Sequence, residues 1–282
     1  MNAAVDTQLS PATFNRIRDF LYRTAGIIIG AEKSSMVVSR LWRRLDKLGC
    51  ADFDSYFAFV SSREGATERG HMLDLLTTNE TYFFREPAHF ARLKNQILPS
   101  VRSRPVRVWC AAASTGEEPY SLAMVLHDSL GPRGWELLAT DISGKVLDHA
   151  RRGLYRMERL EQMPPEYLKR YCRRGVDEYE GMLVIDRALR DQVRFEQHNL
   201  LQPLEDQGGF DVIFLRNVLI YFDQHTKQRV LEHLVAELRP GGWIITGHCE
   251  SLFGLKLPLQ QLSPSIYRCE TCLDPQRARR PA

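Results

Sequence analysis

Apolar residues between positions 10 and 76 recur every three or four residues, which is the period of amphipathic helices. Ser10 and Pro11 suit the N-cap and the first position of such a helix, and Gly49 suits a C-terminal cap. The expected helices begin near Pro11, Ser34, Phe53 and Ala66. We therefore predict an all-α N-terminal helical domain over residues 1–76.

After position 100 the pattern changes to short apolar runs that alternate with amphipathic helical stretches. Such alternation is typical of a parallel sheet covered by helices, as in Rossmann-like folds. Strands are expected at residues 106–110, 135–140, 193–198, 210–215, 243–246 and 260–268. The fold class predicted for residues 101–282 is α/β.

Residues 153–192 interrupt this alternation. Gly175 and Gly181 bracket a turn that is typical of a β-hairpin. The expected neighbouring strands of the hairpin are residues 183–185 and 193–195. We therefore predict a small antiparallel β-subdomain inserted at about residues 165–195, which the core sheet itself does not require.

The composition is that of an ordinary globular protein, with 44% hydrophobic and 26% charged residues in a chain of 282. No apolar run approaches the roughly 20 residues that span a bilayer, and the N-terminus lacks the regions of a signal peptide. A cytoplasmic protein without direct membrane insertion is expected. The net charge of +3 is too small to indicate a nucleic-acid partner by itself.

The cysteines are scattered along the chain, which suits reduced thiols. Cys269 and Cys272 have the spacing of a redox or zinc motif. However, no second pair of Cys or His lies near them to complete a tetrahedral site. No metal is expected.

Basic residues dominate the second expected helix. They are Arg40, Arg43, Arg44 and Lys47. This pattern fits a solvated helix face, and it also fits a docking face for an acidic partner.

Residues 77–87, T-T-N-E-T-Y-F-F-R-E-P, also allow two interpretations. The threonines and the asparagine favour local hydrogen bonds over helix, whereas the aromatic residues are too apolar for a free linker. The segment is either a buried connection or the polar lip of a ligand pocket, with Asn79, Thr81 and Arg85 pointing into it. We assign residues 77–100 to a connecting segment that contributes to the ligand site.

Polar residues follow the expected strands, where ligands of open α/β sheets bind. The first strand runs into A-A-A-S-T-G, which has a single glycine, Gly116, followed by Glu117. Asp141 ends the next strand at a spacing close to that of acids that bind ribose; a helix cap is the alternative. The chain has no G-x-x-x-x-G-K-[ST] loop, and Glu117 would repel a pyrophosphate but attract a sulfonium. S-adenosylmethionine fits both acids, because it carries a sulfonium for Glu117 and a ribose for Asp141.

Several stretches closely resemble the chemotaxis receptor methyltransferases of the CheR family. They are T-T-N-E-T-Y-F-F-R-E, A-A-A-S-T-G-E-E-P-Y-S-L-A-M, A-T-D-I-S, F-D-V-I-F-L-R-N-V-L-I-Y-F-D and L-R-P-G-G. The resemblance covers about residues 14–267. It implies a Rossmann-like S-adenosylmethionine-dependent methyltransferase sheet with the inserted β-subdomain. The implied reaction converts glutamate side chains of methyl-accepting chemoreceptors to methyl esters, with S-adenosylhomocysteine as the second product.

The resemblance also implies roles for individual positions. The residues that match the family's cofactor contacts are Asn79, Thr81, Arg85, Glu117, Asp141, Asn199, Leu200, Leu215 and Arg216. Tyr221 is similar to a tyrosine near the transferred methyl group, and Arg85 and Arg216 are candidates to orient the incoming carboxylate. A glutamate with a pKa of about 4.3 is already ionised at neutral pH, so no general base is expected.

The family's partners follow from the same resemblance. Receptor methylation helices in the family are acidic, which makes the basic second helix a candidate docking face. In some members the β-subdomain captures a C-terminal receptor peptide by strand addition. We expect a monomer that is recruited from the cytoplasm to membrane receptor arrays and has no nucleic-acid partner.

Two other functions stay open on the residues alone. A nucleic-acid methyltransferase would share the sheet and the cofactor, but Asn217 is followed by V-L-I and not by the P-P-[YFW] that base amino-methyltransferases commonly use. A cofactor-binding signalling adaptor without catalysis would keep the fold. The matching cofactor positions and Tyr221 argue against lost activity.

Overall fold

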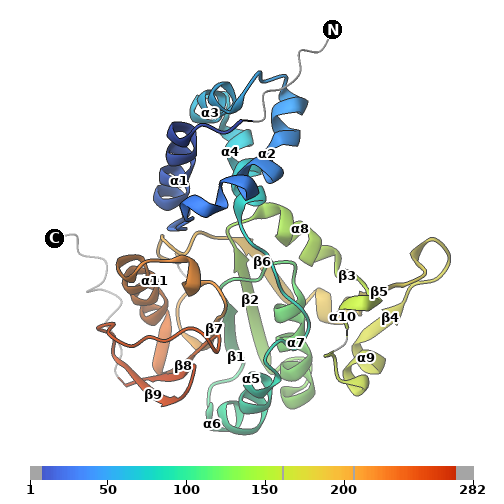
Figure 1. Cartoon of the computed structure of the whole chain (residues 1–282). Helices are drawn as coiled ribbons and strands as arrows, with labels where there is room; N and C mark the ends of the chain where they lie inside the picture. The colour runs from blue at the N-terminus through green and yellow to red at the C-terminus, as the bar shows by residue number, and fades with distance from the viewer. Residues whose placement is uncertain (1–7, 161, 206, 271–282) are drawn as a thin grey trace. The chain divides into compact units, whose positions relative to one another are not determined.

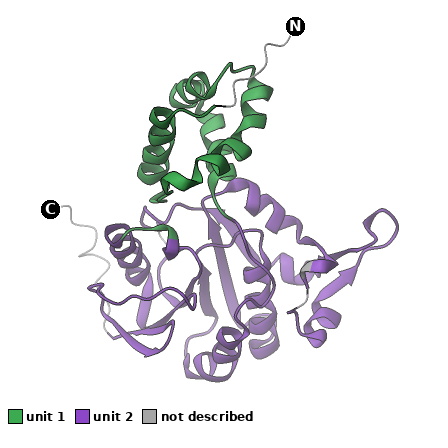
Figure 2. Ribbon diagram, in the orientation of Figure 1, with its two compact units in different colours: residues 1–78, 221–223 green, residues 79–220, 224–282 purple. Residues whose placement is uncertain are grey.

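The structure is a computed structural model that describes residues 8–160, 162–205 and 207–270. Its chain forms two compact units, shown in Figure 2. The first contains residues 1–78 and 221–223, and the second contains residues 79–220 and 224–282. Cys272, and with it the pair that Cys272 would form with Cys269, lies outside the described residues.

The helical unit contains the predicted helices of the all-α domain (Figure 1). They are α1 (Pro11–Ala25), α2 (Ser34–Leu48), α3 (Phe53–Ser61) and α4 (Ala66–Leu76), with a 3₁₀ turn, η1 (Ala31–Lys33), before α2. Ser10 caps α1 by accepting a hydrogen bond from Thr13 N, and Gly49 ends α2 in the left-handed conformation. Asp52 and Ser55 form a capping box at α3. Local capping chemistry thus sets the helix ends.

The second unit is built on a mixed sheet (Figure 1). Among the described residues, seven strands form this sheet in the order β6-β2-β1-β7-β8-β10-β9. Five strands of this sheet pair in parallel, and they are β1 (Val106–Cys110), β2 (Trp135–Asp141), β6 (Val193–Gln197), β7 (Phe210–Leu215) and β8 (Leu238–Thr246). Crossover helices are α7 (Glu117–Leu130), α8 (Gly144–Arg152) and α11 (Gln224–Ala236). This arrangement confirms the predicted Rossmann-like class.

The last part of the sheet differs from the prediction. Residues 260–268 were expected to be one strand, but they form a hairpin of β9 (Leu259–Ser263) and β10 (Ile266–Cys269). The turn depends on Ser265, whose φ of 61° lies in the left-handed region. Glycine usually occupies such a position, so the serine gave no sign of the turn in the sequence. Strand β8 also begins earlier than expected, because the P-G-G turn is an irregularity within the strand.

The predicted insert forms a separate antiparallel sheet. Its strands are β3 (Leu154–Arg156), β5 (Met182–Ile185) and β4 (Cys172–Arg174), with α9 (Pro165–Tyr171), the 3₁₀ turns η3 (Met157–Arg159) and η4 (Asp177–Tyr179), and α10 (Arg187–Arg190) between or beside them. The prediction that residues 193–195 neighbour the hairpin is wrong, since they belong to β6 and pair with β2. Val193 and Phe195 are buried in the hydrophobic core.

The helix before the sheet is longer than predicted. Residues 89–98 were expected to be helical and to end at Pro99, whereas helical structure extends from Pro87 to Ser100. It consists of α5 (Pro87–Arg92), a π-helical turn η2 (Leu93–Ile97) and α6 (Leu98–Ser100). The wide π turn changes the hydrogen-bond pattern just before Pro99, whose missing N–H would otherwise end the helix.

Within the described residues, none of the helices combines the length and the apolarity that a membrane span requires.

Candidate functional site

The turn between β1 and α7 is tightly constrained. Ala113 N donates a hydrogen bond of 2.8 Å to Thr140 O in β2, and Gly116 has a φ of 100°. A Cβ atom at Gly116 would lie 2.6 Å from Tyr155 Oη and 2.7 Å from the Cβ of Ala150. The turn therefore requires glycine both for its left-handed backbone and for the close approach of β3 and α8.

Both acids predicted for the site contact this turn. Glu117 is fully buried at the start of α7, and Thr115 Oγ1 donates a 2.6 Å hydrogen bond to its Oε2. Asp141 ends β2, and its Oδ2 accepts a 2.8 Å hydrogen bond from Ser114 N. Two neighbouring residues of one turn thus bind the two carboxylates, which brings Glu117 and Asp141 to the same edge of the sheet.

Asp141 is not the cap of the following helix. Ser143 is the N-cap of α8, because its Oγ accepts a hydrogen bond from Val146 N. The Oδ1 atom of Asp141 accepts a 3.0 Å hydrogen bond from Ser143 N instead. The helix-cap alternative for Asp141 is therefore wrong, and its carboxylate belongs to the turn at the strand ends.

The segment before α5 contacts the same turn. Ser114 Oγ donates a 2.9 Å hydrogen bond to Asn79 O, and Phe84 N donates a 3.0 Å hydrogen bond to Ser121 Oγ in α7. Thr81 and Phe84 are buried, and Asn79 is half-buried. The segment is thus a packed connection that lies beside the turn, and its role as the lip of a ligand pocket stays a prediction.

The backbone around Arg85 is strained. Phe84 and Glu86 have φ values of 54° and 58°, which bulky residues rarely adopt. Arg85 O accepts a 2.6 Å hydrogen bond from Arg216 Nη2, and the half-buried Arg85 guanidinium donates a 3.0 Å hydrogen bond to Glu80 O. Such a backbone persists only where its surroundings hold it. Arg216 supplies one of those contacts.

Arg216 follows β7 and its side chain is completely buried. Its Nη1 donates to the Glu118 carboxylate, and its Nη2 lies 3.1 Å from Glu86 Oε2. Burial lowers the pKa of Arg216, but the two carboxylates outweigh burial and leave the pKa raised. The guanidinium is therefore charged and its Nη atoms are bound to protein groups.

Sequence reasoning missed Glu86 and Glu118. Each lies directly next to a predicted residue, Arg85 and Glu117, within the motifs R-E-P and G-E-E-P. The sequence does not show whether such an acid is buried or exposed to solvent. The difference becomes visible only in the structure, where Arg216 at the end of β7 lies between the two carboxylates.

A second group of ionisable side chains adjoins Glu86. Ligand-type atoms of Glu86, His89 and His248 all lie within 4.8 Å of one another, a spacing that could hold a metal ion. However, Glu86 Oε2 already accepts a 3.1 Å hydrogen bond from His248 N and faces the Arg216 guanidinium at 3.1 Å. A bound cation would have to compete with both. We therefore assign these side chains to the hydrogen-bonded network around Arg216.

The remaining predicted cofactor residues also lie at strand ends. His198 N donates a 2.9 Å hydrogen bond to Asp141 O, which places the chain after β6 next to that acid. Asn199 Oδ1 accepts a 3.0 Å hydrogen bond from Leu201 N, and Leu200 is buried. Leu215 is the buried last residue of β7.

Tyr221 lies in the 3₁₀ turn η5 (Leu219–Tyr221) and is grouped with the helical unit. There its carbonyl accepts a 2.9 Å hydrogen bond from Ile28 N. Its role near the methyl group stays a prediction.

The basic residues of α2 have different environments. Arg40 donates to the carbonyls of residues 75–77, and Arg44 Nε donates a 2.9 Å hydrogen bond to the buried Glu68. Arg43 and Lys47 are exposed. Arg40 and Arg44 therefore stabilise the helical unit, and a docking role for the four basic residues stays a prediction.

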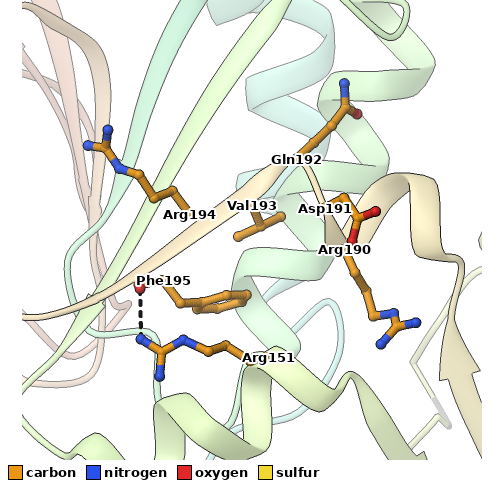
Figure 3. A pocket seen from close by; sticks show the side chains of 7 residues that line it. All are labelled: Arg151, Arg190, Asp191, Gln192, Val193, Arg194 and Phe195. Carbon is orange, nitrogen blue, oxygen red and sulfur yellow. Dashed lines mark hydrogen bonds between the residues drawn. The ribbon is translucent and has the colours of Figure 1, made fainter.

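A surface pocket of about 470 Å³ lies along β6, on residues other than those predicted (Figure 3). Its lining residues are Arg151, Arg190, Asp191, Gln192, Val193, Arg194 and Phe195. Arg151 Nη2 donates a 2.8 Å hydrogen bond to Phe195 O across the pocket, on the outermost strand of the sheet. This hydrogen bond occupies one backbone carbonyl of the edge strand and limits pairing with another chain at that point.

Comparison with known families decides among the remaining functions. Residues 79–267 match the family described as CheR methyltransferase, SAM binding domain, and residues 12–77 match CheR methyltransferase, all-alpha domain. The chain belongs to the CheR methyltransferase family.

Chemotaxis protein methyltransferases of several bacteria are similar to the chain over nearly its full length. The Escherichia coli protein is 43% identical over 92% of this chain and 91% of its own length. The Salmonella typhimurium protein is 40% identical over 92% and 90%. Chemotaxis protein methyltransferase 2 of Pseudomonas aeruginosa is 42% identical over 90% and 91%.

The family assignment confirms the resemblance found in the sequence. This CheR member is an S-adenosylmethionine-dependent chemotaxis protein methyltransferase, and its homology implies chemoreceptor substrates. It is thus an enzyme rather than a cofactor-binding adaptor, and its substrate class differs from that of the base methyltransferases.

Proposed function

We propose that this CheR member transfers a methyl group from S-adenosylmethionine to glutamate carboxylates on chemoreceptor cytoplasmic helices and so produces glutamate methyl esters. The observation that carries the proposal is the glycine turn of residues 111–116, to which Glu117 and Asp141 are both hydrogen-bonded. The turn itself, A-A-A-S-T-G, has no cationic side chain. An acidic site of this kind suits a cationic nucleoside and disfavours a polyphosphate.

The residues present fit the cofactor. The side chains and backbone that would hold it are those of Asn79, Thr81, Glu117, Asp141, Asn199, Leu200 and Leu215. When bound, S-adenosylmethionine supplies a methyl group that its own sulfonium charge activates. The protein therefore has to bind and align the cofactor and the acceptor and to exclude water. Its main contribution is to hold the two reactants close together.

The acceptor needs orientation and not deprotonation. A glutamate carboxylate is ionised at neutral pH, because its pKa is about 4.3. Arg85 is our candidate to orient it, since the Arg85 guanidinium is half-buried and donates to a single carbonyl, Glu80 O, among the described hydrogen bonds. Arg216 would act indirectly, by holding Arg85 O and the adjoining Glu86. Tyr221 would lie near the transferred methyl group, as the family resemblance implies.

The docking assignments belong to the same proposal. Arg43 and Lys47 are exposed on α2 and would attract acidic receptor helices. The β3-β5-β4 sheet has two edge strands, either of which could accept a receptor C-terminal peptide as an added strand. The protein would then act as a monomer in the cytoplasm, at membrane receptor arrays.

Methyl transfer from labelled S-adenosylmethionine to a receptor cytoplasmic fragment tests the proposal. We expect label on the fragment that mild alkali releases as methanol, because a glutamate methyl ester hydrolyses whereas an N-methyl group does not. Replacement of the modified glutamates by alanine should abolish labelling. Alkali-stable label, or none, would show that the proposed reaction is wrong.

A further inference from the structure

Glu250 is a buried carboxylate in the loop that follows β8. Its Oε2 accepts hydrogen bonds of 2.7 Å from Asn217 N and from Gly247 N. Its Oε1 accepts a 2.6 Å hydrogen bond from Leu219 N. One side chain thus binds the main chain of two loops, which follow the neighbouring parallel strands β7 and β8.

The loop after β7 has an irregular backbone. Asn217 has a φ of 58°, and its Nδ2 lies within reach of Glu86 Oε1 at 3.4 Å. A Cβ atom at Gly247 would lie 2.7 Å from Asn217 Nδ2 and 2.8 Å from Glu250 Oε2. A side chain at residue 247 would therefore displace the side chains of Asn217 and Glu250. Glu250 supplies acceptors that a regular strand would have supplied.

A carboxylate is well suited to this position. Burial raises the pKa of Glu250, and the hydrogen bonds from Gly247, Asn217 and Leu219 oppose that effect without cancelling it. The neighbouring groups are all donors, so the site needs an acceptor-only side chain. A glutamine of the same shape would turn an NH₂ group toward at least one backbone N–H and leave that donor unpaired, which costs free energy in a buried place.

We propose that Glu250 is a positioning residue for the cofactor site, which fixes the main chain of residues 217–219 and thereby the adjoining Leu215 and Arg216. Arg216 in turn holds Arg85 O, so the effect extends to the strained segment before α5. Glu250 itself contacts neither cofactor nor acceptor in this assignment. The inference rests on the proposed roles of Leu215, Arg216 and Arg85.

The test compares Glu250→Gln with a matched buried acid in the full-length protein. Asp211 lies at the opposite end of β7, is also buried, and accepts a 2.8 Å hydrogen bond from Arg107 N through Oδ2 and a 2.6 Å hydrogen bond from Ser103 Oγ through Oδ1. Asp211→Asn should therefore disturb the start of β7 and leave the carboxyl end of the strand, where the cofactor is proposed to bind, unchanged. The measurements are the melting temperature, the Kd of S-adenosylhomocysteine by calorimetry, and kcat and KM on a receptor fragment.

We expect both variants to melt at a lower temperature, and only Glu250→Gln to bind S-adenosylhomocysteine about tenfold more weakly, the effect of one or two unpaired buried donors. Its kcat should fall as well, because Arg85 loses its fixed position. Glu250→Asp, which keeps the charge, should recover part of both losses. Equal affinity in Glu250→Gln and Asp211→Asn, measured where both are folded, would show that Glu250 only stabilises the fold. Failure of the wild type to label the receptor would overturn the proposed function alone, since the affinity comparison would still stand.

Discussion

At the scale of single residues, buried charges organise the site more than exposed ones do. Arg216 is completely buried between Glu118 and Glu86 and holds Arg85 O. Breaking a buried pair of this kind leaves an uncompensated charge, so each member depends on the others. Arg85 differs from them because its guanidinium is half-buried, which is why we assign it to the acceptor.

Arg85→Ala tests that assignment. We expect kcat to fall about 10- to 100-fold, because an acceptor carboxylate that is no longer aligned reacts more slowly. Tyr221→Phe should also lower turnover. Arg92→Ala removes a guanidinium from α5 that bonds to Gln96, and it serves as the control. Unchanged methyl transfer from labelled cofactor in Arg85→Ala would remove Arg85 from the mechanism.

His89 makes the stability of the protein depend on pH. Burial, together with the charges of Arg216 and His248, lowers the pKa of His89 to about 4, while Glu86 opposes this. The 3.3 Å contact with Glu86 is therefore not an ion pair at neutral pH. The unfolded chain binds the proton below about pH 6.5, and the folded protein does not bind it until about pH 4. Stability should thus fall as the pH drops through this window.

Denaturant unfolding at pH 7.5 and pH 5 measures the effect. The wild type should lose more free energy of unfolding between the two values than His89→Asn does, by roughly 1 to 3 kcal/mol. His225→Asn, on the exposed start of α11, is the control. Equal losses in the wild type and His89→Asn would contradict a neutral His89.

At the scale of elements, the helix ends of the N-terminal domain followed from neighbouring residues, whereas strand partners did not. The helix over residues 34–48 and the capping residues Ser10 and Gly49 were predicted from local chemistry, and the structure confirms them. The partner of residues 193–195 was predicted incorrectly. Alternating apolar residues suit any sheet, so this pattern does not reveal that the partner is β2.

The glycine turn is the element on which the site depends most. Gly116→Ala should lower the free energy of unfolding by about 1–3 kcal/mol for the left-handed backbone, with a further loss from contact with Tyr155 and Ala150. It should also weaken S-adenosylhomocysteine binding. Gly181→Ala is the matched control, since Gly181 also has a positive φ, 78°, and no described atom lies within 4 Å of its Cβ position. Equal destabilisation by the two changes would mean that the close approach at Gly116 is unimportant.

At the scale of the whole molecule, the two units carry different parts of the proposed function. The α/β unit contains the residues proposed to hold the cofactor, and Arg43 and Lys47 are exposed in the helical unit. Arg44 belongs to the interior, because it pairs with the buried Glu68. Attraction between exposed charges is screened by salt, whereas the cofactor site should be insensitive to it.

Arg43→Glu/Lys47→Glu should therefore lower kcat/KM for the receptor at low ionic strength and flatten its salt dependence. The Kd of S-adenosylhomocysteine should stay at the wild-type value. Arg18→Glu/Arg63→Glu changes the same charge elsewhere in the helical unit and is the control. A salt titration in which the α2 variant follows the wild-type curve would reject docking on this face.

The sequence by itself determined the fold class, the helices of the N-terminal domain and the polar residues at strand ends, because these depend on periodicity, capping and the rule that ligands bind at carboxyl ends of parallel strands. It also predicted Glu117 and Asp141 as acids of the site, and the structure brings both to one turn. Only the tertiary structure decided which charges are buried together: Glu86 and Glu118 around Arg216, and Glu250 across two loops. These contacts join residues far apart in the chain, and no local pattern distinguishes a buried acid from a solvated one until the strands bring its partner beside it.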